Sequence, residues 1–414
     1  MDPKIKPTTT HTTEIDHDYT FTAVPHSARK GFWPMFFIML GFTFFSASMS
    51  VGAKMANGLN FPQFLTAIVI GGIILGAYTG VLGYIGSQTG LSLDLLAQRS
   101  FGKTGSYLPS ALISFTQVGW FGVGVAMFAV PAADLLNINP WILIIIAGAL
   151  MTSSAYFGIK GLQIVSYISV PLIAVLGIYS MVTATSQGGG LMAIFDQSVG
   201  GMTVATGVGM VIGSFVSGGT ATPNFVRFAK SSWSAVVTTV IAFFLGNTLM
   251  FMFGAVGGAF TGQEDIFYVM IAQGLTLFAL LVLGANIWTT NDNALYTSSL
   301  GISNITKLPH RPVVMIAGFI GTITALWLYN NFVGWLSFLN ATLPPIGAII
   351  TLDFFLNRSK YDNEEGVDRH VNWFAILGVI AGALVGNYLN WGVAAINAMI
   401  ASVIVYYVGN RLAK

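Results

Sequence analysis

Long apolar stretches separated by short polar loops run along almost the whole chain. Twelve of these stretches are long enough to cross the roughly 30 Å hydrocarbon layer of a membrane as α-helices. Their predicted bounds are 32–56, 62–86, 106–135, 141–160, 162–184, 203–222, 233–260, 267–300, 312–331, 333–356, 371–389 and 391–410. The pattern predicts an all-α polytopic membrane protein with twelve transmembrane helices, embedded in a lipid bilayer.

Lysine and arginine occur in every second loop between these stretches. Cytoplasmic loops of membrane proteins carry an excess of these residues. Lys54, near the outer end of the first stretch, is the one exception. The residues that follow the alternation are Arg29, Lys30, Arg99, Lys103, Lys160, Arg227, Lys230, Lys307, Arg311, Arg358, Lys360, Arg369, Arg411 and Lys414. The alternation predicts that both termini are cytoplasmic, and it favours dividing 141–184 into two helices at Lys160.

Three segments outside the apolar stretches give further expectations. Residues 1–28 are polar and acidic and lack the apolar segment of a signal peptide, which predicts a disordered cytoplasmic tail. The leucines of the loop 87–105 predict an interfacial or re-entrant helical segment on the cytoplasmic side. The charged segment 358–370 predicts a solvated loop that separates the last two helices, in 371–414, from the ten before them.

Composition excludes several classes of protein. Only 8% of the 414 residues are Asp, Glu, Lys or Arg, whereas a soluble domain has about 25%. The net charge of +2 does not favour nucleic acid binding. The absence of cysteine excludes disulfides and thiolate metal sites. No P-loop motif is present, so ATP is not expected to drive transport.

Polar, glycine-rich segments interrupt the first and sixth stretches, at 41–50 and at 213–223. Inside a bilayer, unwound backbone persists only where it lines a cavity or binds something, because no water is there to bond it. A pair of such breaks in corresponding positions is typical of transporters built from inverted repeats. We therefore expect two repeats of opposite orientation, at 29–184 and 203–356, in a transporter for a small solute. Pro344-Pro345 is expected to kink the tenth helix.

The densest polar cluster inside an apolar stretch is the run NIWTTNDN at 286–293. Asn286, Thr289 and Thr290 share a helical face there, and oxygen ligands without thiolate or imidazole favour a hard cation. One interpretation is a sodium site formed by the two threonines and by carbonyls of the broken first helix. The other is that these residues only hydrogen-bond neighbouring helices. The density of polar side chains favours the sodium site.

Charge inside the apolar stretches is scarce, and all five histidines lie in the tail or in loops. Ionisable residues within a membrane mark proton and ion paths, so a long proton relay is not expected. Asp292 is the one carboxylate well inside a stretch. It is either a coupling carboxylate or a group held by neighbouring Thr or Asn or by Arg227, and we favour the second role. The same scarcity predicts an uncharged cargo.

A candidate site for the cargo lies in the third stretch, where Gln117, Trp120 and Gly124 stack on one helical face. A planar ring between Trp120 and Phe215, at the second break, would gain about 1–3 kcal/mol of stacking per face. Gln117, with Asn291, would then bond the polar edge of that ring. The alternative is that Trp120 only packs in the core.

At these residues the chain resembles the nucleobase:cation symporter-1 family, over about 24–410. The matching segments are PHSARKG (25–31), TQVGWFGVGVAMFA (116–129), NIWTTNDNALY (286–296) and ALWLYNNFVGWLSFL (325–339). These segments are long, and the resemblance is correspondingly specific. It implies the leucine-transporter-type fold, a five-plus-five inverted repeat of helices followed by two extra helices.

The resemblance also implies roles for individual residues. A substrate-binding Trp of the family corresponds to Trp120, and its aromatic residue at the sixth-helix break corresponds to Phe215, preceded by Ser214. The implied sodium ligands are the carbonyl of Asn286, the hydroxyls of Thr289 and Thr290, and first-helix carbonyls near Phe42 and Phe45.

The sequence departs from a related hydantoin transporter at two positions. Phe215 stands where that relative has Trp, and Leu295 stands where it has a substrate-binding Asn. Asn291, one turn earlier, is the candidate replacement for that Asn. The resemblance therefore supports stacking of a ring more directly than it supports the polar contacts.

Together these features indicate a sodium-coupled symporter that imports a neutral nucleobase, cytosine by the resemblance, by alternating access across a bacterial inner membrane. We expect the unwound backbone at 213–219 to reject uracil, because its N–H and C=O groups have fixed polarity. The alternatives are a channel, or a transporter for another small neutral heterocycle (uracil, hydantoin or a purine), including a proton-coupled one. An enzyme is not expected, because paired intramembrane acids and metal ligands are lacking. No obligatory protein partner is inferred.

Overall fold

The computed structural model describes residues 18–196, 198–362, 369–389 and 391–412. Within these residues every regular element is helical, and the one strand-like contact is an isolated bridge between Lys30 and Ala229. The predicted all-α class is therefore confirmed for the part of the chain that the structure describes.

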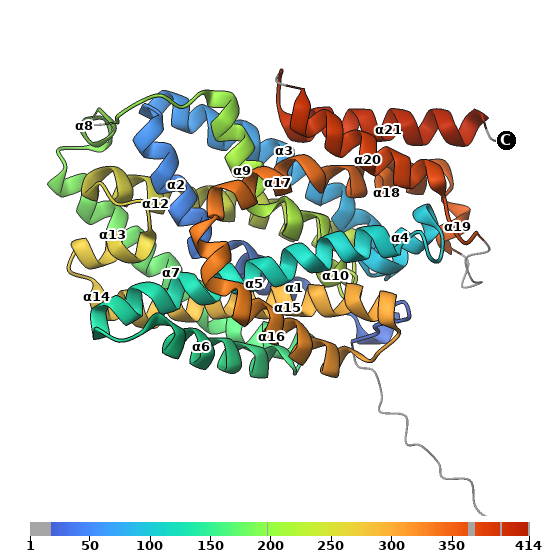
Figure 1. Cartoon of the computed structure of the whole chain (residues 1–414), viewed down its shortest axis with the longest axis horizontal. Coiled ribbons are helices and arrows are strands. Elements are labelled where there is room, and N and C mark those ends of the chain that lie inside the picture. Colours follow the sequence, from blue (N-terminus) through green and yellow to red (C-terminus); the bar gives the residue numbers. More distant parts are fainter. Residues whose placement is uncertain (1–17, 197, 363–368, 390, 413–414) are drawn as a thin grey trace, which may run out of the picture.

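The helices run lengthwise through the molecule and have two distinct ends (Figure 1). α4 (Leu93–Phe101) and α10 (Pro223–Val226) lie at one end, which we call the basic end because Arg99 and Arg227 belong to it. α8 (Leu191–Phe195) and α13 (Ile266–Ala272) lie at the opposite end.

Eight helices are long and apolar enough to cross a membrane, and a bent pair adds a ninth among the described residues. The eight are α3 (Phe61–Thr89), α5 (Tyr107–Leu136), α7 (Ile159–Gln187), α9 with α10 (Val204–Val226), α11 with η2 and α12 (Ser232–Thr261), α16 (His310–Asn330), α17 with α18 (Gly334–Leu356) and α21 (Ala394–Leu412). Two further apolar helices, α6 (Pro140–Ala155) and α20 (Trp373–Tyr388), are shorter. Several spans are thus present, while the count of twelve and the repeat boundaries stay predictions.

The first span is the bent pair, and it breaks where the sequence predicted a break. α1 (Phe32–Thr43) and α2 (Ser46–Gly58) meet at an angle of 47°. Phe45, between them, is extended, with φ −125° and ψ 128°. The interruption expected within 41–50 is therefore confirmed.

The sixth span is interrupted within the predicted segment 213–223, but only near the end of that segment. α9 (Val204–Thr220) is continuous, and the break lies at Ala221 and Thr222, before α10. The hydroxyls of Ser214 and Thr220 donate to carbonyls of α9 itself, at 2.8 and 2.7 Å, so they need no unwound backbone. A Cβ on Gly218 would lie 2.5 Å from the ring of Phe42, which shows that this glycine serves packing. The unwound backbone predicted at 213–219 is wrong.

The eighth span is also displaced from the predicted 267–300. α13 is a separate helix, and Gly274, with a φ of 76°, follows it. The span itself is continuous from Thr276 to Thr306. Its parts are α14 (Thr276–Phe278), the π-helical η3 (Ala279–Leu283) and α15 (Gly284–Thr306).

The seventh and tenth spans are irregular too. In the seventh, α11 (Ser232–Val240), the π-helical η2 (Ile241–Gly246) and α12 (Asn247–Thr261) are continuous. In the tenth, α17 (Phe332–Thr342) gives way to α18 (Pro344–Leu356). Pro344 and Pro345 form the first turn of α18, so the predicted interruption at these prolines is confirmed.

The loop 87–105 contains the predicted helical segment, α4, but this helix is buried. Leu93, Leu96 and Phe101 are at most 1% exposed. α4 therefore packs inside the basic end instead of lying on its surface. The charged loop at 358–370 contains α19 (Ser359–Asp362), and its residues 363–368 lie outside the described residues.

Residues 18–30, which we call the strap, cross the basic end and include η1 (His26–Ala28). The buried guanidinium of Arg227 donates to the carbonyls of Asp18 (2.7 Å) and Tyr19 (2.9 Å). The carboxylate of Asp18 accepts from the amide of Ile159, at the start of α7, at 3.2 Å. The disordered tail expected over 1–28 is therefore wrong for residues 18–28, and residues 1–17 lie outside the described residues.

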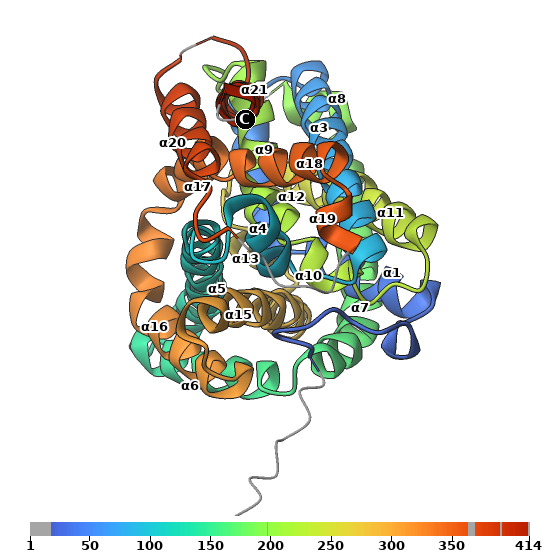
Figure 2. The ribbon, with the colours of Figure 1, turned by 90° about the vertical axis from the view of Figure 1, so that its right-hand side faces the viewer.

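Glycines bring α2 and α12 into backbone contact. A Cβ on Gly254 would lie 1.8 Å from the carbonyl oxygen of Met49, and one on Gly52 would lie 2.1 Å from that of Phe251. Real Cβ atoms do not approach carbonyl oxygens so closely, so each position requires glycine. α5 and α15 lie side by side through the middle of the molecule in both views (Figures 1 and 2), and they supply one wall of the central site.

Candidate functional site

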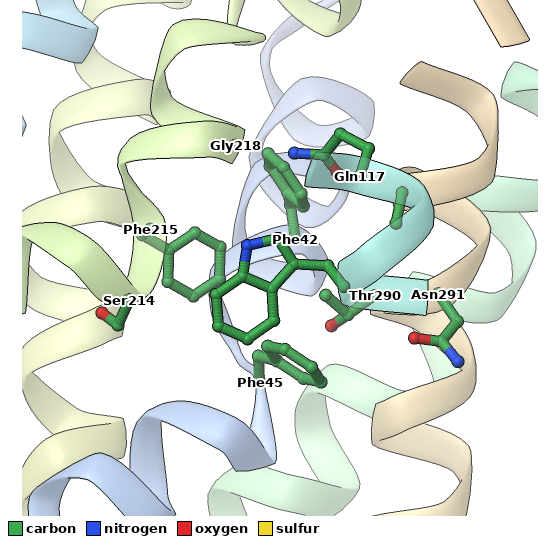
Figure 3. A pocket seen from close by; sticks show the side chains of 10 residues that line it. Phe42, Phe45, Gln117, Ser214, Phe215, Gly218, Thr290 and Asn291 are labelled. Atoms are coloured by element: carbon green, nitrogen blue, oxygen red, sulfur yellow. The ribbon is translucent and has the colours of Figure 1, made fainter. Parts of the chain in front are cut away.

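A small cavity lies at the centre of the molecule, beside the break between α1 and α2 (Figure 3). Four elements meet there: the α1–α2 break, α5, α9 and α15. The lining residues are Phe42, Phe45, Gln117, Trp120, Ser214, Phe215, Gly218, Thr290, Asn291 and Ala294. The structure thus brings together all the predicted substrate residues except Gly124.

Aromatic rings fill most of this cavity. The ring centroids of Phe45 and Trp120 are 5.8 Å apart at an interplanar angle of 73°, and those of Phe42 and Phe215 are 5.6 Å apart at 88°. Such edge-to-face contacts are favourable by themselves. The free space is about 10 Å³, which is about what one water molecule needs. A planar ligand must therefore displace these rings before it can stack between them.

Gln117 is the polar side chain of α5 at the cavity. Its Nε2 donates to the hydroxyl of Ser217 on α9 at 2.8 Å, and that hydroxyl lies 2.7 Å from the hydroxyl of Thr116. Ser214, one turn before Ser217, donates its hydroxyl to Val211 of its own helix. Gln117 is thus held by α9, whereas the hydroxyl proton of Ser214 is already used.

Asn291 lies on α15, on the same side of the cavity as Gln117 and opposite Ser214 and Phe215 of α9 (Figure 3). Its Nδ2 donates to the carbonyl of Phe121 at 3.2 Å and to the sulfur of Met151 at 3.1 Å. Its Oδ1 is buried and has no hydrogen-bond partner among the described residues. A Cβ on Gly124 would lie 2.2 Å from that oxygen. Gly124 therefore makes room for Asn291. It does not line the cavity, contrary to the prediction.

The α1–α2 break releases two backbone carbonyls. In a continuous helix the amides of Phe45 and Ser46 would bond to the carbonyls of Gly41 and Phe42. Here the amide of Phe45 bonds to the carbonyl of Thr43 at 2.9 Å, and the amide of Ser46 bonds to the side chain of Asn286 at 2.9 Å. The carbonyls of Gly41 and Phe42 have therefore both lost their helical partners, and that of Gly41 accepts instead from the hydroxyl of Thr290 at 3.5 Å.

The two predicted first-helix ligands, Phe42 and Phe45, differ in whether their carbonyls keep a backbone partner. The carbonyl of Phe45 already accepts from the amide of Ser48 at 3.0 Å. The hydroxyl of Thr290 lies 3.5 Å from the carbonyl oxygen of Gly41, one residue before Phe42. The released carbonyls are thus those of Gly41 and Phe42, which include the suggested Phe42 but not Phe45.

Oxygen atoms from α15 and α7 surround the released carbonyls. The hydroxyls of Thr289 and Ser169 are 2.6 Å apart. The hydroxyl of Ser166 is buried without a partner among the described residues, and a Cβ on Gly41 would lie 2.3 Å from it. Asn286 ties α15 to the break, because its Nδ2 also donates to the carbonyl of Phe44. We call Gly41, Phe42, Ser166, Ser169, Asn286, Thr289 and Thr290 the oxygen cluster.

The oxygen cluster contains no charged side chain. Within the described part of the chain, no group of three or more His, Cys, Asp or Glu residues could hold a metal ion. Neutral hydroxyl and carbonyl oxygens suit a hard cation of low charge. The chemistry of the cluster is therefore consistent with the predicted sodium site.

Asp292 points away from the cavity and toward α6. Its Oδ1 accepts from the hydroxyl of Ser154 at 2.6 Å, and the same hydroxyl accepts from the indole N–H of Trp288 at 2.6 Å. Its Oδ2 is buried and makes no hydrogen bond to the described residues. The pairing with Arg227 that the sequence allowed does not occur, because Arg227 bonds to the strap and to Tyr296.

The side chains that line the cavity are all buried. The strap crosses the basic end of the molecule, and α13 lies at the opposite end. The amide of Ile266 in α13 donates to the hydroxyl of Ser50 in α2 at 3.2 Å, and Tyr329 of α16 donates to Asp265 at 2.8 Å. Burial raises the pKa of Asp265, which precedes α13. The cavity is thus enclosed within the molecule.

Sequence reasoning missed several residues of the site. Ser217 follows Ser214 by three residues, and Thr116 precedes Trp120 by four, so helical spacing could have indicated them. Ser166 and Ser169 lie in α7, whose apolar sequence gave no such signal. Only the packing of α7 against α1 and α15 brings these two serines to the break.

The sequence of this chain is similar to those of known transport proteins. Residues 23–409 match the model of a family described as permease for cytosine/purines, uracil, thiamine, allantoin. The cytosine permease of Escherichia coli (strain K12) is 49% identical over 401 residues, which are 96% of this chain and 95% of that protein. The purine-uracil permease NCS1 of Arabidopsis thaliana is 22% identical over 351 residues, 74% of this chain and 58% of that protein.

Solved structures share the fold. A nucleobase-cation-symport-1 family transporter, in a closed conformation with bromovinylhydantoin bound, has a TM-score of 0.80 at 20% identity over 94% of both chains. A Na⁺-coupled sialic acid symporter in an outward-open state has a TM-score of 0.73 at 14% identity, over 97% of this chain and 93% of that one. These relatives are permeases and transporters, not enzymes. The chain therefore belongs to the family of permeases for cytosine and purines, uracil, thiamine and allantoin.

Proposed function

We propose that this chain imports cytosine together with sodium by alternating access. The proposed setting is the inner membrane of a bacterium, with both termini in the cytoplasm and inverted repeats at 29–184 and 203–356. The lipid bilayer, the nucleobase and the sodium ion are its only proposed partners.

The observation that carries the proposal is the contact between the cavity and the oxygen cluster. Thr290 and Phe42 belong to both, and Asn291 of the cavity directly follows Thr290 in α15. A cation bound by the Thr290 hydroxyl and the Phe42 carbonyl would hold the α1–α2 break against α15. It would thereby fix two walls of the cavity, which is a direct physical route to coupling.

Sodium suits the oxygen cluster better than a divalent ion. Calcium and magnesium sites in proteins normally include carboxylates, and the cluster has none. Ser166, whose buried hydroxyl otherwise lacks a partner, would gain one from a cation.

A neutral aromatic base suits the cavity. Its lining contains four aromatic rings and no charged side chain, and burying an unpaired charge there would be very costly. A base that displaced the edge-to-face contacts of Trp120 and Phe215 would replace them with stacking. The identity of 49% to a cytosine permease over nearly the whole chain supports cytosine among the neutral bases.

Uptake by proteoliposomes tests the proposal. We expect accumulation of radiolabelled cytosine when an inward sodium gradient is imposed, and none when choline replaces sodium at constant membrane potential. Because coupling is reciprocal, cytosine should also lower the sodium concentration needed for half-maximal binding. Uptake that follows an imposed pH gradient and ignores sodium would refute sodium coupling.

Proton coupling is the second candidate, and Asp292 favours it. A buried carboxyl with an unbonded oxygen inside a span is a candidate proton carrier. Replacing Asp292 with Asn should abolish uptake if protons drive it and should retain sodium-driven uptake if sodium does. The exposed Asp196→Asn is the matched control, since it removes a carboxylate far from any span interior.

A further inference from the structure

A chain of hydrogen bonds runs from the backbone of α5 to the side chain of Gln117. The hydroxyl of Thr116 lies 2.8 Å from the carbonyl oxygen of Ile113 and 2.7 Å from the hydroxyl of Ser217. Ser217 in turn lies 2.8 Å from Nε2 of Gln117. Of these four hydrogen-bonded residues, Gln117 is the one that lines the cavity.

The direction of this chain follows from counting protons. A backbone carbonyl can only accept a hydrogen bond, and each hydroxyl has one proton to donate. If Thr116 donates to Ile113, then Ser217 donates to Thr116, and Gln117 must donate its Nε2–H to Ser217. This direction makes three hydrogen bonds.

The reverse direction makes fewer hydrogen bonds. If Thr116 donated to Ser217, and Ser217 donated to Oε1 of a turned-over Gln117 amide, Ile113 would receive no proton from Thr116. Thr116 and Ser217 are 0% exposed, so water does not replace the lost partner. The loss of one buried hydrogen bond disfavours this arrangement by up to about tenfold.

We infer that Thr116 and Ser217 fix the orientation of the Gln117 amide, and that this orientation makes the site prefer a base with an amino donor over one with a carbonyl at the same position. With Nε2 bound to Ser217, the acceptor Oε1 is left for the ligand. Cytosine presents an amino group where uracil presents a carbonyl oxygen, as their base-pairing edges show. The inference rests on the proposed function, because it concerns the base that this cavity binds.

This mechanism replaces the one that the sequence suggested. The backbone of α9 at 213–219 is helical, so its N–H and C=O groups bond within the helix and cannot discriminate between bases. Ser217 contributes through its side chain instead. Thr116 and Ser217 act as positioning residues, because they do not themselves need to touch the base.

Asn291 supports the same polarity from α15, the helix that packs beside α5. Its Nδ2 donates to the carbonyl of Phe121, which can only accept, so its Oδ1 is the free group. The amides of Gln117 and Asn291, on adjacent helices, therefore both present acceptors. Cytosine has three N–H bonds and uracil has two, so such a site is satisfied better by cytosine, and an acceptor left unpaired disfavours uracil.

Competition binding to the purified protein in sodium tests the inference. The measured quantity is the ratio of the dissociation constants of uracil and cytosine. Thr116→Val removes the hydroxyl at nearly constant volume and frees Ser217 to donate to a turned-over Gln117. We expect this ratio to fall by about three- to tenfold, with a smaller change in the binding of sodium.

Thr116→Ser is the matched variant, because it keeps the hydroxyl and should restore the ratio of the unmodified protein. Ser217→Ala removes the partner of Gln117 by another route and should also lower the ratio, which covers the case in which Thr116→Val does not fold. A ratio within twofold of the original in folded Thr116→Val and Ser217→Ala would overturn the inference. Failure of the unmodified protein to bind either base would instead overturn the proposed function.

Discussion

Replacement of Arg227 with Gln should open the basic end of the molecule. The guanidinium of Arg227 is fully buried and donates to the carbonyls of Asp18 and Tyr19 in the strap. Hydrogen bonds that involve a charged group contribute about 1.5–3 kcal/mol each. Two such bonds therefore stabilise the docked strap by at least about 3 kcal/mol, or about 100-fold in the equilibrium between docked and released strap.

The assay uses an introduced cysteine, since the chain has none of its own. Ala294 lines the cavity and is 1% exposed, so Ala294→Cys reports access to the site. In inside-out vesicles, a membrane-impermeant maleimide should label this cysteine at least tenfold faster when Arg227→Gln is also present. Arg411→Gln is the matched control: it makes the same change at the end of the last helix, away from the strap.

Deletion of residues 1–20 should have a similar effect, because it removes the acceptors and leaves Arg227 in place. An unchanged labelling rate in both folded variants would show that the strap does not cover the site. Slower labelling would refute the reasoning as well, since it would mean that the strap favours the conformation open at the basic end.

Three further predictions concern single residues. Trp120→Ala should abolish detectable cytosine binding in an equilibrium binding assay while leaving a folded protein, because one face of the stack is lost; binding within a few-fold of the original would place the site elsewhere. Thr289→Ala should raise the sodium concentration for half-maximal cytosine binding, because it removes one hydroxyl from the oxygen cluster, and an unchanged value would exclude Thr289 as a ligand. Burial raises the pKa of Asp94 in α4 from 3.8 to about 6, so the folded protein favours the protonated carboxyl. The contribution of Asp94 to stability should thus be fully present below about pH 4 and be lost, by up to about 3 kcal/mol, as the pH rises through about 6; thermal unfolding of Asp94→Asn should lack this part of the pH dependence.

Sequence patterns located the spans and the residues of the site better than they described the backbone. Apolar length and the break near Phe44 and Phe45 follow from local composition, and both are seen in the structure. The sixth span breaks at 221–222, within the expected 213–223, but its backbone at 213–219 is helical and not unwound, because glycine and serine have two uses inside a membrane. In α9 the serines bond within their own helix and Gly218 accommodates Phe42, so the same composition yields a packed helix.

Contacts between distant segments were beyond the reach of local patterns. Asp18 and Tyr19 looked like part of a polar tail, yet a single buried arginine orders them. Ser166 and Ser169 lie in an apolar helix and reach the α1–α2 break only through tertiary packing. The direction of the amide of Gln117 depends on a hydroxyl from another helix, which no one-dimensional pattern encodes.

The backbone contact between α2 and α12 has a mechanical consequence. Carbonyl oxygens of Met49 and Phe251 occupy the space beside Gly254 and Gly52, so neither helix can slide along the other without a steric clash. The two helices must then move as one rigid body, which acts as a lever. The extended residues between α1 and α2 are the nearest point at which the chain can bend, so displacement of that lever would act at the hinge where the carbonyls of Gly41 and Phe42 are released.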